Sequence, residues 1–86
     1  MGKPLFASTC LTYFERERRR TRGVENLDQL EARWNRICDA MELNAALHPN
    51  WSSEKRVWRR GVARSVRRFV QQECSWTRLA IQTLQA

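Results

Sequence analysis

The clearest hydrophobic pattern lies in the middle of the chain. Apolar residues recur there at spacings of three and four positions, at Leu27, Leu30, Trp34, Ile37 and Met41. That spacing places all of them along one side of an α-helix. The pattern predicts a helix over residues 26–47 whose apolar seam packs in a bundle core or forms a homodimer interface.

Polar residues at both ends of this segment carry helix signals. Asn26 is a favoured N-cap, and Gln29 follows it at capping-box spacing. At the other end, His48 precedes Pro49, and the residue before a proline disfavours helical backbone. The helix is therefore expected to end at His48.

A second run with helical spacing follows a short turn, and it predicts a helix over residues 52–74. Three residues are candidate N-caps. They are Asn50, Ser52 and Ser53. The apolar stripe of this helix comprises Trp58, Val62, Val66 and Phe69. Gly61 lies inside the helix at a cost of about 1 kcal/mol relative to alanine, which suggests close approach of another backbone or of a ligand.

The two ends of the chain carry weaker patterns. A helix over residues 8–22 is expected to begin at Ser8, Thr9 or Thr12 and to stop at Gly23, with its charged turns projecting into solvent. A break near Cys74 is expected to precede a short helix over residues 75–85. The prediction is an all-α fold, a single domain over residues 1–86 built as a bundle of three to four helices.

Charge is distributed unevenly between the two halves. The chain carries a net charge of +7, and residues 50–86 hold eight basic and two acidic side chains, a balance of +6. Residues 1–49 hold eight basic and seven acidic side chains, a balance of +1. The basic character therefore belongs to the C-terminal half, which indicates a local binding surface.

The basic residues concentrate in one strip of the third predicted helix, between positions 55 and 68, where no acid occurs. The strip consists of Lys55, Arg56, Arg59, Arg60, Arg64, Arg67 and Arg68. Five of them are expected to share one face without a compensating acid, an arrangement that costs stability through like-charge repulsion. These five are Arg56, Arg60, Arg64, Arg67 and Arg68. A strip of this kind attracts a polyanion or an acidic protein surface.

The four tryptophans divide between core and surface. Trp34 and Trp58 lie on the predicted buried stripes, so core packing is expected for both. Trp51 lies in the turn beside the basic helix and is the tryptophan expected to be exposed and available for contact. The sequence leaves Trp76 undecided.

No residue pattern points to catalysis or to a cofactor. His48 is the single histidine and has no ligand or catalytic partner at a suitable spacing, so no metal site is expected. Three cysteines, Cys10, Cys38 and Cys74, form no paired motif, which predicts buried, reduced thiols in an intracellular chain. No apolar run approaches membrane-spanning length, and a membrane partner is not expected.

The sequence favours a non-enzymatic binding protein. The leading hypothesis is contact between the basic strip and a nucleic-acid backbone, with weak sequence preference and about five phosphates neutralised. The alternative is an adaptor or inhibitor that docks this helix and Trp51 on an acidic surface of a larger protein, as small viral or phage regulators do. The choice between DNA and RNA stays open.

Overall fold

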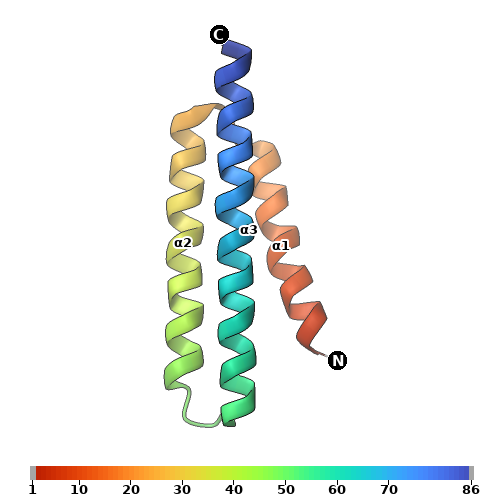
Figure 1. Ribbon diagram of the computed structural model, residues 1–86, viewed down its shortest axis with the longest axis vertical. Coiled ribbons are helices and arrows are strands. Elements are labelled where there is room, and N and C mark those ends of the chain that lie inside the picture. The colour runs from red at the N-terminus through yellow and green to blue at the C-terminus, as the bar shows by residue number, and fades with distance from the viewer. Residues whose placement is uncertain (1, 86) are drawn as a thin grey trace.

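The computed structural model describes the backbone of residues 2–85 and the side chains of residues 8–84. It contains three helices, α1 (Gly2–Arg20), α2 (Gly23–Leu47) and α3 (Ser53–Gln85). Over the described backbone there is no strand, and the predicted all-α bundle is confirmed. The helices run up, down and up, with α2 and α3 side by side and α1 crossing α3 at an angle (Figure 1). The molecule measures 51 × 22 × 16 Å.

The core lies mainly between α2 and α3. Its buried side chains from these two helices are Leu27, Leu30, Trp34, Cys38, Val62, Val66, Val70 and Cys74. Helix α1 adds Phe14, whose ring packs edge-on against Trp34 at a centroid distance of 5.6 Å and against Phe69 at 5.9 Å. Because apolar area is the main source of folding free energy, this cluster holds the three helices together.

The predicted α2 seam is correct except at one position. Leu27, Leu30 and Trp34 are buried, whereas Ile37 is 38% exposed and Cys38 is fully buried in its place. Cys38, four positions after Trp34, stays on the side of α2 that faces α3. Ile37, three positions after Trp34, lies at the edge of the core. Since the seam lies inside the core of a single chain, a homodimer formed through it requires the bundle to open.

Both ends of α1 differ from the prediction. The helix begins at Gly2, and the expected cap residue Thr12 lies inside it, where its hydroxyl donates a 2.8 Å hydrogen bond to the carbonyl of Ser8. The helix ends at Arg20, and Gly23 adopts a φ of 81° at the start of α2. The left-handed backbone expected at Gly23 is therefore present, but it opens the second helix.

The N-cap of α2 also differs from the expectation. The helix begins three residues before Asn26, and the Asn26 side-chain amide donates a 2.7 Å hydrogen bond to the carbonyl of Arg22. The Arg22 side chain, at the N-cap position, makes no capping hydrogen bond. The predicted end of α2 is confirmed, because the helix stops at Leu47 and His48 has extended backbone.

The third and fourth predicted helices form one continuous helix. Ser52 is the N-cap among the three candidates, since its hydroxyl accepts a 3.1 Å hydrogen bond from the backbone N–H of Lys55. The expected break at Cys74 is absent from α3. That expectation rested on Glu73, a charged residue on the apolar stripe. Glu73 lies 3.7 Å from Arg18 of α1, which neutralises it within the bundle.

Candidate polyanion-binding surface

Three arginines of the predicted strip point away from the core of the bundle. Each precedes a buried valine by two positions, and two positions correspond to roughly 200° around a helix. The pairs are Arg60 with Val62, Arg64 with Val66, and Arg68 with Val70. All three arginines are exposed, and they form a line along the outer side of α3 that we call the α3 row.

Two residues of the strip have acidic partners on α2, which contradicts the expected uncompensated face. Arg67 pairs with Asp39 and with Glu42 at 2.6 Å each, and Arg64 pairs with Glu42 at 3.1 Å. The hydrogen bond from Arg67, followed by that from Arg64, lowers the pKa of the Glu42 carboxyl. The acids lie more than twenty positions earlier in the chain, so spacing along α3 alone did not reveal them.

The lower end of the strip packs on the α2–α3 turn. The Arg56 guanidinium donates a 2.7 Å hydrogen bond to the carbonyl of His48. The Trp51 ring stacks on the His48 ring at 4.2 Å and 6°, and Lys55 and Arg59 lie over it at 4.9 and 5.0 Å. These contacts fix the turn against the start of α3.

Trp51 is therefore not the exposed tryptophan. Trp51 is half-buried, and His48, Lys55 and Arg59 contact its ring. Trp76, by contrast, is 63% exposed. Trp76 follows the buried Cys74 by two positions, so the same 200° rule places it on the outer side of α3. With Leu79, Gln72 and Ser75 it lines a shallow hollow of about 220 Å³. Helical spacing from Cys74 predicts that Trp76 is exposed, but the expected break near Cys74 meant that the spacing was not continued to Trp76.

The two tryptophans predicted in the core lie there, and two of the three thiols are buried as predicted. Trp34 is buried, and Trp58 is half-buried against the core. Cys38 and Cys74 are buried and Cys10 is partly buried. Burial raises the pKa of Cys38 and of Cys74 to about 11. A thiol with so high a pKa is almost wholly protonated near neutral pH and is a poor nucleophile.

The described residues form neither a metal-binding cluster nor a membrane-spanning helix. Within the described part of the chain, no three acidic, histidine or cysteine side chains gather at a possible metal position. No helix there is both long enough and apolar enough to cross a bilayer. Comparison with known protein families, curated proteins and solved structures gives no match to this chain.

Proposed function

We propose that the chain binds the phosphate backbone of nucleic acid through the α3 row. Consecutive members of the row are four residues apart, which corresponds to about 6 Å along the helix axis. Along the axis of a duplex, the phosphates of one strand are spaced by about 3.4 Å, so this distance exceeds one phosphate step. Each guanidinium is therefore spaced to meet a different phosphate, and guanidinium pairs with phosphate through two parallel hydrogen bonds.

The observation that carries this proposal is the state of Arg60 and Arg68. Both side chains are exposed, and neither has an ion pair or hydrogen bond with any other side chain that the structure describes. Arg64, between them, is shared with Glu42 but keeps 63% of its side chain exposed. An unpaired guanidinium on a solvent-facing row is available to an incoming anion without breaking an internal contact.

The expected contacts carry little sequence information. Guanidinium groups that bind phosphates fix the position of a protein on its ligand but do not read the bases. Helices α1 and α2 flank α3 (Figure 1), and the row lies on the side of α3 opposite its buried valines. We therefore expect backbone binding with weak sequence preference.

The test is the salt dependence of binding to a short DNA duplex. Three phosphate contacts predict a log–log slope of about −2.7. This is shallower than the slope near −4 to −5 implied by five contacts, because Arg67 pairs with acids of α2 and Arg56 is bonded to the His48 carbonyl. Arg60→Gln and Arg68→Gln should each make the slope shallower by about 1. Arg36→Gln is the matched control, since it removes the same charge from an exposed position of α2.

Two results would contradict phosphate binding through the α3 row. A slope near zero, or equal slopes for Arg60→Gln and Arg36→Gln, would show that the row does not contact phosphates. Circular dichroism checks that each variant stays helical, which is expected because glutamine is a good helix former. Repeating the titration with a duplex RNA distinguishes a general backbone binder from one that prefers DNA geometry.

A second candidate function is supported by the exposed apolar residues beyond the row. Trp76 and Leu79 are 63% and 55% exposed on the same outer side of α3. An exposed aromatic anchor on a basic chain is typical of protein interfaces, so an acidic protein is the alternative ligand. A stoichiometric partner captured from nuclease-treated lysate by the wild type, and lost with Trp76→Ala, would favour an adaptor. Duplex binding unaffected by Trp76→Ala would show that the two ligands use different residues.

A further inference from the structure

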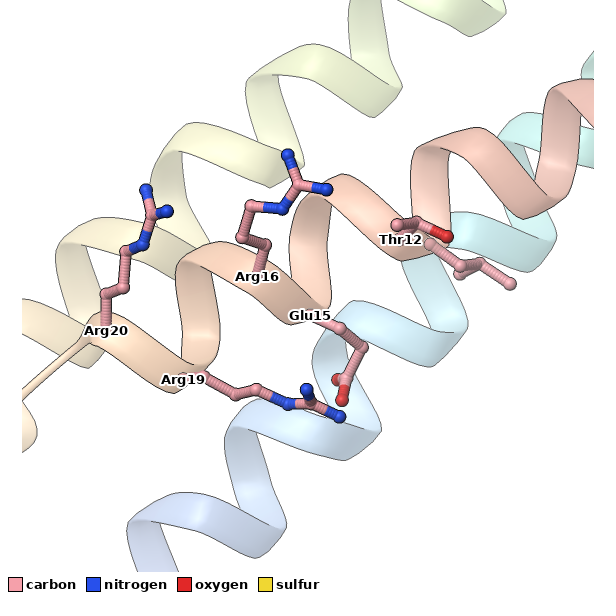
Figure 2. Close-up of a pocket in the computed structure, with 6 residues that line it drawn as sticks. Thr12, Glu15, Arg16, Arg19 and Arg20 are labelled. Carbon is pink, nitrogen blue, oxygen red and sulfur yellow. The ribbon is translucent and has the colours of Figure 1, made fainter.

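A second group of arginines lies on the outer side of α1. Arg16 follows the buried Phe14 by two positions, which places it roughly 200° around the helix, opposite the core. Arg16 and Arg20 extend to the same side of α1, and Arg19 extends towards Glu15 (Figure 2). Between them is an open hollow of about 570 Å³. Its lining consists of Leu11, Thr12, Glu15, Arg16, Arg19 and Arg20.

The acids of α1 are already engaged elsewhere. Arg18 donates two hydrogen bonds of 2.9 Å to the two carboxylate oxygens of Glu15, and this pairing, with a smaller contribution from the charge of Arg19, lowers the Glu15 pKa. Glu17 pairs with Arg33 and accepts a 2.8 Å hydrogen bond from the Trp34 ring nitrogen. Neither carboxylate is left to neutralise the two outermost arginines of α1.

Arg16 and Arg20 therefore lack an acidic partner in the described part of the chain. The Arg16 guanidinium lies over the Tyr13 ring at 5.7 Å, a contact that leaves its charge in place. Two arginines four positions apart on a helix repel one another and destabilise it. No contact within the bundle offsets that repulsion, so an external anion would relieve it.

The basic surface continues onto the α1–α2 turn. A second hollow, of about 310 Å³, is lined there by Arg20 and Arg22 together with α2 residues that include Leu30 and Arg33. Arg22 is exposed and makes no ion pair with the residues described. We call Arg16, Arg19, Arg20 and Arg22 together the α1 surface.

The α1 surface and the α3 row face different directions. Helix α1 rests on α3 through the Phe14–Phe69 contact and through Arg18, which donates a 3.3 Å hydrogen bond to Thr77. Those contacts lie beyond the C-terminal end of the row, and they turn the outer side of α1 away from α3. Figure 2 accordingly shows the arginines of α1 in front, with α2 and α3 passing behind. Phe14 of α1 and the buried valines of α3 face the same core, so the arginines opposite them point outward from two different helices.

We propose that the α1 surface is a second binding surface for a phosphate-bearing polyanion, so that one molecule holds two nucleic-acid segments at once. This inference rests on the function proposed for the α3 row. It assigns to the α1 surface the same ligand chemistry, guanidinium to phosphate, at a separate place on the molecule. The chain would then act as a bridge between two backbones.

The test is capture of a second duplex. An unlabelled DNA duplex is immobilised, the protein is bound to it, and retention of a fluorescent duplex in solution is measured. The wild type should retain the labelled duplex. The double variant Arg16→Gln/Arg20→Gln should still bind the immobilised duplex through the α3 row but should retain no labelled duplex. The control Arg36→Gln should behave as the wild type.

Each contrary outcome has a distinct meaning. If Arg16→Gln/Arg20→Gln retains the labelled duplex as well as the wild type does, the α1 surface is not the second site and the inference is overturned. If the wild type binds the immobilised duplex but retains no labelled duplex, bridging is refuted while the proposed function stands. If adding Arg60→Gln/Arg68→Gln to the Arg16→Gln/Arg20→Gln variant leaves its binding to the immobilised duplex unchanged, the proposed function itself fails.

Discussion

The substitution Gly61→Ala tests whether a ligand approaches the outer side of α3. Gly61 lies in the interior of a 33-residue helix and is exposed. Apart from its chain neighbours and the nearby backbone of α3 itself, a Cβ atom built at Gly61 finds no atom within 4 Å. No neighbouring backbone in the described structure therefore requires a glycine here, although close approach of another backbone was one explanation for it. Approach of a ligand to the α3 row stays a prediction.

Replacement by alanine should stabilise the protein. Glycine in a helix interior is about 0.8–1.0 kcal/mol less favourable than alanine, and the open space means that no clash reduces the gain. For a domain of this size, about 1 kcal/mol corresponds to a rise in melting temperature of about 4–8 °C. Ser65→Ala is the matched control, because Ser65 is also exposed on α3 and its change raises helix propensity by a smaller amount, roughly 0.5 kcal/mol.

The assay combines urea unfolding, followed by circular dichroism, with duplex binding at fixed salt. Gly61→Ala should unfold at higher urea than Ser65→Ala and yet bind the duplex more weakly than the wild type, because its methyl group stands between Arg60 and Arg64 where the backbone approaches. If Gly61→Ala is less stable than the wild type, the claim that a methyl group fits at this position without a clash is refuted. A stabilised protein with unchanged affinity would refute close approach of the ligand at this point.

Three further predictions concern the core, the thiols and the ion pairs. Trp34→Ala should lower the free energy of unfolding by about 3–5 kcal/mol in urea titrations, because the ring is almost fully buried between three helices. A thiol reagent such as iodoacetamide should modify Cys10 before Cys38, which should react only when the bundle opens, as mass spectrometry of partly labelled protein would show. The pKa of Glu42 is lowered in the fold, so its contribution to stability is present above about pH 4.5 and is lost as the pH falls further. In a profile of unfolding free energy against pH, Glu42→Gln should therefore flatten the acidic part.

Hydrophobic spacing predicted the helices better than it predicted their ends. The stripe of α3 and most of the α2 seam were correct because burial on one side of a helix imposes the repeat directly. The starts of α1 and α2 were wrong because capping residues occur inside helices as well as at their ends. Thr12 satisfies its hydroxyl on Ser8, and Asn26 satisfies its amide on Arg22.

The basic strip was visible in the sequence, but its internal compensation was not. Repulsion was expected because acids four positions away on the same helix are absent. The actual partners of Arg64 and Arg67 are Asp39 and Glu42, which antiparallel packing of α2 brings alongside. Such pairs depend on the register between two helices, which helical periodicity does not determine.

The ion pairs explain where the net charge of this protein resides. Seven of the nine acids pair with arginines among the described side chains, and most of these pairs join one helix to another. Arg18, Arg67 and Arg78, with side chains only 23–27% exposed, lie at the edges of the core and connect the helices in this way. The seven acids pair with only five arginines, and most of the other basic side chains that the structure describes are exposed. Arginine thus has two roles in this fold, set by its angle on the helix. At the edge it stabilises the bundle, and on the outer sides of α1 and α3 it stays available for an anion.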